Sequence, residues 1–265
     1  MPTQTFADGC LRLTPGRVAI VELNAPARRN AVNLAMWAAL PQVCAAIAGD
    51  DRVRAVILRG VAGPGGPVFS AGADIAEFAE VCATPERAAR YNAAVRAAQQ
   101  ALRDLPRPVI AEVAGPCVGG GCGLALSCDL RFASEAAVFG ITPARLGIGY
   151  SVEDTALLVQ TVGPARAKDI LFSARLLPAA EALALGLADR VLAPDALQAA
   201  TAAYADSLAN LSPDSIRLAK AVINRLSAAG SDDMDDQRAR VAATFSGRDF
   251  AEGRSAFLVR RPPVF

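Results

Sequence analysis

Two short apolar runs, each followed directly by a glycine-containing loop, limit the possible folds of this chain more than any other feature. Val53–Gly60 and Val109–Val113 have the length and apolar content of buried strands. The loops behind them lead into predicted helices, one that begins at Pro85 and ends near Leu105, and one over Gly121–Ser127. Because strand and helix alternate in this way, we predict an α/β fold.

The remaining segments add strands and helices around these units. A hairpin, a helix capped by Asn33 and a further strand are predicted over Leu11–Leu13 with Arg17–Leu23, Asn33–Ile47 and Asp129–Ala133. From Thr155 onward the pattern is mostly helical, with breaks at proline pairs such as Gly163-Pro164. We therefore expect an α/β core that is followed by a helical region.

Composition removes several classes of function. The 265 residues include no histidine, which excludes imidazole bases and His-ligated metals. The six cysteines contain no C-x-x-C pair, so zinc-ribbon and thioredoxin-type sites fail and no metal is predicted. A net charge of +1 and few aromatic residues argue against a nucleic-acid partner.

Location is constrained by the same composition. No stretch approaches the roughly 18 apolar residues that a membrane span needs. The N-terminus shows neither a basic region nor an apolar region of a secretion signal. We therefore expect a cytoplasmic protein with free thiols and no membrane partner.

The two loops behind the apolar runs have the composition of a carbonyl-binding site. They are Phe69–Ile75 and Ala114–Gly123. Small residues let a ligand approach the backbone, and N–H groups at a helix start have no intrahelical partner. Such a pair of loops can hold a carbonyl oxygen that becomes an oxyanion. Taken alone, the glycine run also fits tight packing of a helix on a strand, and it matches neither a P-loop nor a dinucleotide fingerprint.

Taken together, the two loops resemble those of the crotonase superfamily, the enoyl-CoA hydratase/isomerase family. Further segments follow in the order that this family shows, so the resemblance covers nearly the whole chain. These segments are Asn24–Ala31, Phe139–Gly140, Leu146–Ile148, Val162–Ala167, Ala182–Val191 and Glu252–Phe257.

The resemblance implies a fold, a substrate class and an assembly. The fold is a crotonase-like spiral of βα units over residues 1–195, which carries an oxyanion hole and a coenzyme A site. Residues 196–265 form a helical region that supports trimers, or hexamers built as dimers of trimers. The substrate is an acyl-CoA or enoyl-CoA thioester, so coenzyme A is part of the substrate and no separate cofactor is implied.

The resemblance also places the binding groups. The oxyanion hole falls on the backbone N–H groups of Ala73 and Gly120. The coenzyme A site is lined by Ala27, Arg28, Arg29, Ala71, Asp74, Ile75 and Gly119. For Arg28 and Arg29, phosphate binding and plain solvation are both open. For Asp74, capping of the next helix is the alternative.

Two positions depart from the family pattern. Hydratases of this family use two glutamates to handle a water molecule. In this chain those positions are Gly123 and Pro143, and neither side chain moves a proton. General acid–base catalysis contributes roughly 10²–10⁴ in rate, so ordinary hydration is expected to be weak or absent. One-glutamate isomerases of the family use the second position, which is also lost.

Side chains of one nearby segment are the remaining candidates for proton transfer. Tyr150 aligns with a tyrosine of some decarboxylating members, and Glu153 and Asp154 follow where some isomerases place an aspartate. Plain packing of Tyr150, and a helix-dipole role for the two carboxylates in a helix starting near Thr155, are the alternatives. Cys122 is expected to be an inert buried thiol.

Two hypotheses of different class follow. The first is an enzyme that stabilises a thioester enolate and carries out hydration, isomerisation or decarboxylation, with Tyr150 or Glu153 as the proton-handling group. The second is a catalytically inactive subunit that binds a CoA thioester.

Overall fold

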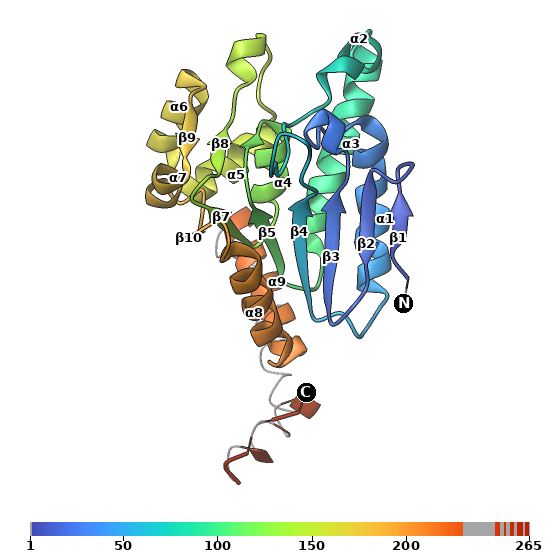
Figure 1. Cartoon of the computed structure of the whole chain (residues 1–265), viewed down its shortest axis with the longest axis vertical. Coiled ribbons are helices and arrows are strands. Elements are labelled where there is room, and N and C mark those ends of the chain that lie inside the picture. The colour runs from blue at the N-terminus through green and yellow to red at the C-terminus, as the bar shows by residue number, and fades with distance from the viewer. Residues whose placement is uncertain are drawn as a thin grey trace.

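A seven-stranded sheet forms the centre of the computed structural model (Figure 1). The structure describes residues 2–229, 247–249, 252, 255–256, 259–261 and 263–264. In spatial order the strands are β1 (Gln4–Phe6), β2 (Leu11–Thr14), β3 (Val18–Leu23), β4 (Ala55–Gly60), β5 (Val109–Val113), β7 (Leu130–Ser134) and β10 (Arg190–Leu192). The first three strands pair antiparallel, and from β3 onward all neighbours are parallel.

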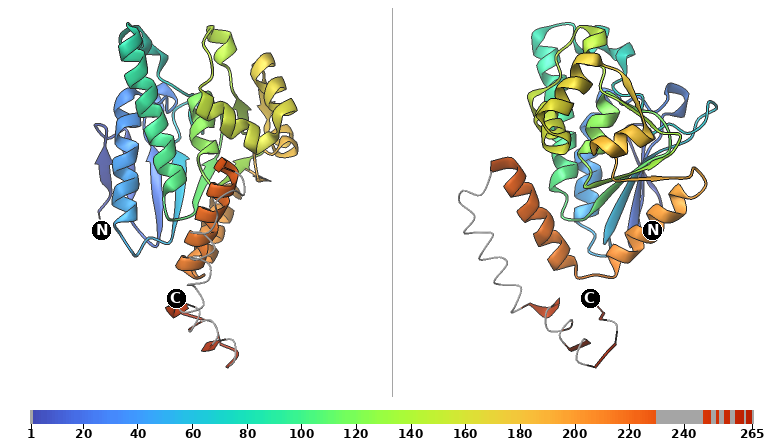
Figure 2. Two further views of the ribbon diagram at one scale, coloured as in Figure 1. Left: turned by 180° about the vertical axis from the view of Figure 1, so that it is seen from behind. Right: turned by 90° about the vertical axis from the view of Figure 1, so that its left-hand side faces the viewer.

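Helices cover both faces of this sheet. On one face, α1 (Leu34–Ala48) and α3 (Pro85–Asp104) lie side by side and close the larger apolar core (Figure 2). On the other face, α8 (Leu197–Ala209) packs on a smaller cluster that includes Ile57, Ile110 and Phe132. The first four residues of β4 are buried without alternation because both of its faces are covered.

A second, three-stranded sheet and a group of helices complete the structure. The strands are β6 (Cys117–Val118), β8 (Val138–Gly140) and β9 (Leu176–Pro178). The helices are α4 (Gly120–Leu126), α5 (Val152–Val162), α6 (Pro164–Ser173), α7 (Ala179–Leu185) and α9 (Pro213–Ala229). Two projections rise above the sheet in Figure 1, and they are formed by η2 (Ile75–Glu77) with α2 (Phe78–Val81), and by η3 (Pro143–Leu146).

The structure confirms most of the predicted elements and corrects others. The predicted hairpin, the buried strands and the helix that follows Pro85 are all present. The side chain of Asn33 caps α1 as expected, since it accepts a hydrogen bond from the N–H of Met36 at 2.9 Å. The chain after Thr155 is mostly helical as predicted, but it also contains β9 and β10, which were not predicted because three-residue strands are too short to show a period. Half of the predicted C-terminal segment Glu252–Phe257 lies outside the described residues, namely Gly253, Arg254 and Phe257.

The helix that follows residue 195 packs on the central sheet. This helix, α8, lies beyond the boundary predicted there and buries Leu197 and Ala205 against the strands of the sheet. The helical region therefore begins as a layer of the α/β core. Helix α9 then turns back on the other side of the core from α8 (Figure 2), where Lys220 donates to Asp129 at 2.8 Å and Asn224 donates to the carbonyl of Arg103 at 3.0 Å.

Candidate functional site

The two glycine-containing loops meet above neighbouring parallel strands. One follows β4 and the other follows β5, so both lie at the carboxyl ends of these strands. The N–H of Ser70 donates to the carbonyl of Pro116 at 3.1 Å, and the N–H of Val118 donates to the carbonyl of Ser70 at 3.0 Å. These hydrogen bonds hold the loops side by side over a short bridge between Ser70 and Cys117.

The backbone N–H of Ala73 is turned away from the strand-like pairing around it. Ala73 forms a parallel bridge with Val32, in which Val32 binds the residues on either side. The N–H of Val32 donates to the carbonyl of Gly72 at 2.7 Å, and the N–H of Asp74 donates to the carbonyl of Val32 at 3.0 Å. In such a bridge the central residue directs its own N–H to the opposite side.

Gly120 supplies a second N–H with no acceptor in its own helix, because it is the first residue of α4. A Cβ atom built on Gly120 would lie 3.4 Å from the backbone nitrogen of Ala73, so the two N–H groups are close neighbours. Within the part of the chain that the structure describes, neither group donates to a protein acceptor. Two adjacent backbone donors are thus left for one acceptor atom from outside the chain.

Gly72 makes this close approach possible. Its φ is +101°, a conformation that residues with a Cβ rarely adopt. A Cβ atom there would lie 2.7 Å from the carbonyl oxygen of Val118 and 3.2 Å from the nitrogen of Gly120. A larger residue would therefore push the two loops apart.

A third loop is fastened to this pair through Asn30. Its buried side-chain amide accepts from the N–H of Ala25 at 3.0 Å and donates to the carbonyls of Val61 and Val68 at 2.9 Å each. The hydroxyl of Ser70 donates to the carbonyl of Asn30 at 2.8 Å. Three segments that are distant in the sequence thus share one hydrogen-bond network. The role of Asn30 leaves no local signal in the sequence, because the carbonyl groups that it binds come from Val61 and Val68, more than 30 residues away.

The predicted coenzyme A residues lie around this network. Arg28 forms an ion pair with Asp74 at 2.6 Å, and the Asp74 carboxylate also caps η2 through the N–H of Ala76 at 3.2 Å. The capping role expected for Asp74 is therefore confirmed. Ala27, Arg28 and Arg29 are exposed on the neighbouring loop.

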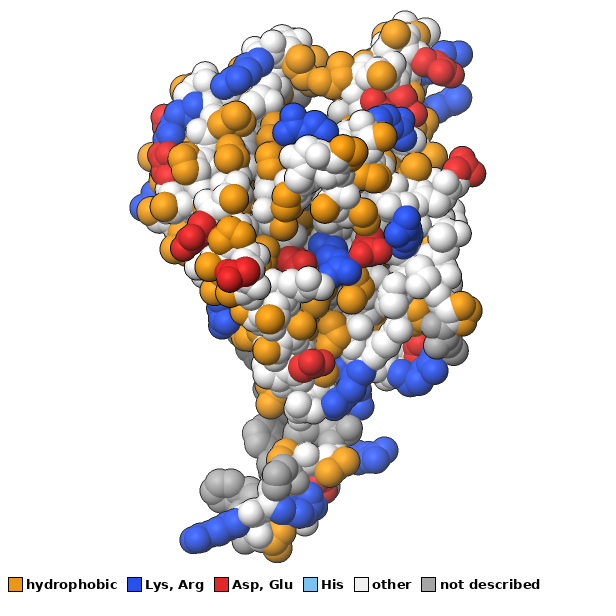
Figure 3. All heavy atoms as spheres, viewed as in Figure 1, with side chains coloured by type: hydrophobic (Ala, Val, Ile, Leu, Met, Phe, Trp, Pro, Cys, Tyr) orange, Lys and Arg blue, Asp and Glu red, His pale blue; other side chains and the backbone are white. Residues whose placement is uncertain are grey.

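The other predicted coenzyme A contacts lie on the two glycine-containing loops themselves. Ala71 and Ile75 are exposed, and Gly119 directly precedes the α4 helix start. Ile75 on one projection and Leu146 and Ile148 on the other are large apolar residues about half exposed, at 54%, 50% and 47%. Figure 3 shows the molecular surface dipping between these two projections.

The two positions expected to carry glutamates hold no ionisable group. Pro143 begins η3. Gly123 lies one turn after Gly120 on α4. The side chains of Gln99 and Asp154 fill the space that a side chain at this position would occupy. A Cβ atom built on Gly123 would lie 2.4 Å from the amide nitrogen of Gln99 and 3.0 Å from a carboxylate oxygen of Asp154.

Asp154 is a buried carboxyl group with defined partners. One oxygen accepts from the Nε2 of Gln99 at 2.8 Å, and the other accepts from the hydroxyl of Ser151 at 2.7 Å. Burial raises the pKa of Asp154 above its ordinary value. Helix α5 begins at Val152 with Ser151 as its N-cap, three residues earlier than predicted. The Ser-x-x-Asp spacing signals such a cap, whereas contact with Gln99 on α3 leaves no local signal.

Tyr150 carries a hydroxyl that is buried and has no hydrogen-bond partner among the described residues. Burial raises the pKa of Tyr150 well above 10, and the charge of Asp154 adds to this effect. The phenol is therefore neutral near pH 7. A buried polar atom without a partner is rare in folded proteins, which makes this hydroxyl a functional candidate.

Glu153 and Cys122 are placed away from such a role. The Glu153 carboxylate is 46% exposed and forms an ion pair with Arg96 at 2.9 Å. This position favours its alternative role as a first-turn carboxylate of α5. The Cys122 thiol is buried and donates to the carbonyl of Cys117 at 2.8 Å, as an inert thiol would.

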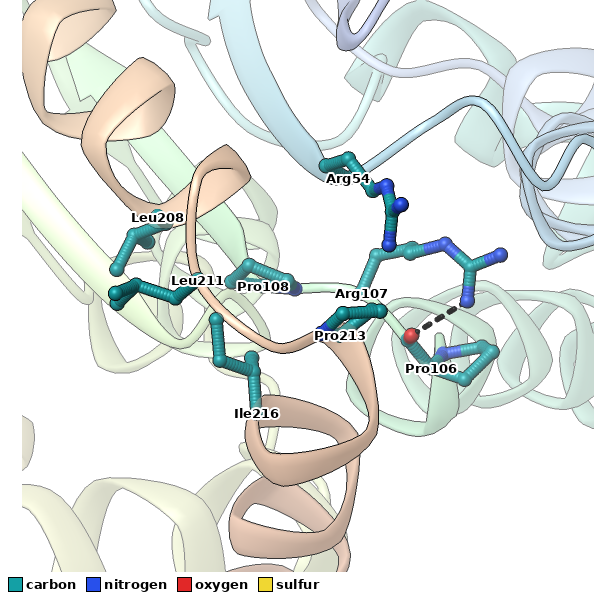
Figure 4. Close-up of a pocket in the computed structure, with 8 residues that line it drawn as sticks. All are labelled: Arg54, Pro106, Arg107, Pro108, Leu208, Leu211, Pro213 and Ile216. Atoms are coloured by element: carbon teal, nitrogen blue, oxygen red, sulfur yellow. Dashed lines mark hydrogen bonds between the residues drawn. The ribbon is translucent and has the colours of Figure 1, made fainter. Parts of the chain in front are cut away.

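A separate hollow lies at the opposite end of the sheet. It sits where Pro106, Arg107 and Pro108 lead into the amino end of β5, beside the α8–α9 connection (Figure 4). Because the oxyanion-type donors follow the carboxyl ends of the strands, this hollow is not part of the same site.

Two absences concern the described part of the chain. No group of three or more His, Cys, Asp or Glu side chains there is placed to hold a metal ion. None of the helices described is both long and apolar enough to cross a membrane.

Comparison with known proteins agrees with these features. The family model described as enoyl-CoA hydratase/isomerase matches residues 14–265. The short-chain-enoyl-CoA hydratase of Clostridium acetobutylicum is 34% identical, with 93% of each chain covered. A crystal structure of an enoyl-CoA hydratase/carnithine racemase from Magnetospirillum magneticum is 37% identical, with a TM-score of 0.91 over 97% of this chain and 95% of that one. The enoyl-CoA hydratase structure from Bacillus anthracis is 28% identical, with a TM-score of 0.89 over 97% and 98%.

Proposed function

The chain belongs to the enoyl-CoA hydratase/isomerase family, whose members act on acyl-CoA thioesters, and on this premise we propose that it turns over its substrate through a thioester enolate without the usual glutamates. The observation that carries the proposal is the pair of adjacent N–H groups on Ala73 and Gly120, which donate to no acceptor among the described residues. Gly123 and Pro143 are the positions that lack the usual acid–base side chains.

The two N–H groups act on the thioester oxygen. Both donate to the carbonyl of the bound thioester, and their hydrogen bonds strengthen as negative charge builds on the oxygen. Each such donor is typically worth about 2.7–4 kcal/mol of transition-state stabilisation. Because the donors belong to loops held by several hydrogen bonds, they need little rearrangement during the reaction.

Proton transfer falls to the buried polar groups of the 150–154 segment and not to the exposed carboxylate of Glu153. The Tyr150 phenol is neutral at pH 7 and its hydroxyl is unpartnered, so it can donate a hydrogen bond or a proton to the reacting group. A proton donor alone supports decarboxylation most directly, because loss of CO₂ itself forms the enolate, whereas isomerisation also needs a base for the α-proton and hydration needs a base for water.

The remaining parts of the proposal concern coenzyme A and assembly. Arg29 is exposed on the loop next to the glycine-containing loops, and its side chain can bind a phosphate of coenzyme A. The side chain of Arg28 instead forms an ion pair with Asp74. Family membership supports a trimer or a hexamer, and the free cysteines of the described chain suit a reducing cytoplasm.

Thioester assays test the proposal directly. We expect crotonyl-CoA to keep its enoyl absorbance at least 100-fold longer than with an ordinary hydratase of the family at equal concentration. We expect at least one enoyl- or malonyl-type thioester to be converted in a panel followed by mass spectrometry. Rapid hydration of crotonyl-CoA would overturn the assignment of Gly123 and Pro143. Binding of several thioesters without conversion of any would favour the inactive binding subunit, for which the two lost glutamates are the specific observation.

A further inference from the structure

Gly123 has no side chain, and it lies on the face of α4 that also carries the Gly120 donor. A carboxyl group from another helix occupies the space beside Gly123. Gly123 lies three residues after Gly120, so both residues share one helix face. Asp154 of α5 and Gln99 of α3 both reach the point where a side chain of Gly123 would begin. The chain therefore holds a carboxyl group next to the oxyanion donors although α4 itself supplies none.

We propose that Asp154 is the proton-transferring carboxyl group of the thioester site, that it enters from α5 the space left by Gly123, and that Gln99 and Ser151 position it. This inference rests on the proposed function, because it assigns a role within the same site. It also chooses between the two roles that the sequence left open for Asp154, proton transfer and a first-turn carboxylate of the helix.

The hydrogen bonds around Asp154 suit a positioned base. Gln99 donates a hydrogen bond to one carboxylate oxygen and Ser151 donates to the other. The two hydrogen bonds fix the plane of the carboxylate and leave a lone pair free on each oxygen. No cation pairs with Asp154 among the described residues: Arg96, the cation at this end of α3, is paired with Glu153. The charge of Asp154 contributes, after burial, to the raised pKa of Tyr150.

The proton-transfer step balances without another reactant. The Asp154 carboxylate takes a proton from the α-carbon of the acyl group. The electron pair of the broken C–H bond forms the C=C bond of the enolate, and the C=O π pair moves to the oxygen held by Ala73 and Gly120. Return of the proton from the Asp154 carboxyl to carbon reverses the step.

Exchange of α-protons in D₂O measures this step alone. Wild-type protein is incubated with butyryl-CoA, and deuterium incorporation is followed by mass spectrometry, while binding of butyryl-CoA is measured by calorimetry. We expect wild-type exchange, and in Asp154→Asn a decrease of at least about 100-fold with nearly unchanged affinity. Asn keeps an acceptor for Gln99, so the fold is maintained. The matched control is Glu153→Gln, the exposed neighbour, which should exchange at the wild-type rate.

A rescue series separates a catalytic carboxyl group from a structural one. The double variant Gln99→Ala with Asp154→Ala should lose exchange and open the space beside Gly123. Adding Gly123→Glu to that variant returns a carboxylate from α4, and we expect exchange to recover at least tenfold.

The outcomes distinguish this inference from the proposed function. If wild-type protein binds butyryl-CoA and Asp154→Asn exchanges as fast as wild type, the role of Asp154 is overturned while the thioester site stands. Binding without any wild-type exchange overturns the role of Asp154 as well. If butyryl-CoA and the other thioesters fail to bind at all, the proposed function fails first.

Discussion

The two halves of the proposed thioester site are built from different parts of the chain. The oxyanion half consists of backbone N–H groups on two loops, held by Gly72, Ser70 and Asn30 through hydrogen bonds whose partners are all accounted for. The proton-transfer half consists of side chains, where Asp154 is buried against Gln99 and the hydroxyl of Tyr150 has no partner. One half is a property of the main chain, and the other depends on which side chains the helices bring together.

This difference shows why the two halves respond differently to substitution. A change of side chain cannot remove a backbone donor, although it can displace one by steric pressure. A single substitution does remove a carboxyl group or a phenol. We therefore expect glycine substitutions to report on the first half and conservative polar substitutions to report on the second.

Gly72→Ala should produce the largest effect. The new Cβ would press on the carbonyl of Val118 and the nitrogen of Gly120, so we expect turnover to fall about 100- to 1000-fold, as when an oxyanion donor is lost. Gly66→Ala is the control, since Gly66 has a similar φ of +96° and open space around it. Both variants place an alanine at a positive φ and so bear similar backbone strain. Comparing their kcat/KM values on the substrate found in the thioester panel therefore isolates the steric effect at Gly72. Equal losses in both would contradict the placement of the donors.

Asn30→Ala tests the scaffold beneath the oxyanion half. It removes three hydrogen bonds and leaves buried backbone groups without partners, so the free energy of unfolding should fall by about 2–3 kcal/mol. Asn33→Ala removes only the N-cap of α1 and should cost about 1 kcal/mol. Urea unfolding of both variants makes the comparison. A smaller loss for Asn30→Ala than for Asn33→Ala would show that the three-loop network is not a main source of stability.

Tyr150→Phe tests whether the unpartnered hydroxyl takes part in the reaction. We expect turnover to fall about tenfold or more. The free energy of unfolding should stay the same or rise by up to about 1 kcal/mol, because an unsatisfied buried hydroxyl is removed. Unchanged kcat together with unchanged stability would reduce Tyr150 to a packing residue.

The pH dependence of stability tests the burial of Asp154. Its pKa in the folded protein is raised by burial, so folding favours the protonated carboxyl group. That contribution is fully present below the ordinary aspartate pKa of 3.8 and is lost as the pH rises through the raised pKa. Wild-type protein should therefore lose stability relative to Asp154→Asn as the pH rises above 3.8, by urea unfolding at a series of pH values. The neighbouring groups to account for are the charged Glu153, which is paired with Arg96, and the phenol of Tyr150, which stays neutral because its pKa is raised.

Glu153→Gln should have the smallest effect. The carboxylate pairs with Arg96 at the surface, where such pairs contribute about 0–1 kcal/mol. We expect unfolding free energy within about 0.5 kcal/mol of wild type, and unchanged turnover. A loss of turnover would return Glu153 to the proton-transfer half.

The sequence indicated the backbone half of the site better than the side-chain half. Gly72 and the glycine run after β5 mark positions where only small residues fit, and these glycines can be seen directly in the local sequence. The burial of Asp154 depends on Gln99, 55 residues away on another helix, so no local pattern contains it. The strands β9 and β10 escaped prediction for the same reason, because three-residue strands are defined by their neighbours.

Main-chain donors have a consequence for how such a protein changes its chemistry over time. The N–H groups of Ala73 and Gly120 are inherited with the path of the backbone, so a lineage keeps them as long as it keeps the fold. The carboxyl group, by contrast, belongs to a side chain, and in the proposed site it reaches the space beside Gly123 from α5. A change of reaction would then require only that this acid be moved, while the donors that hold the thioester oxygen stay in place.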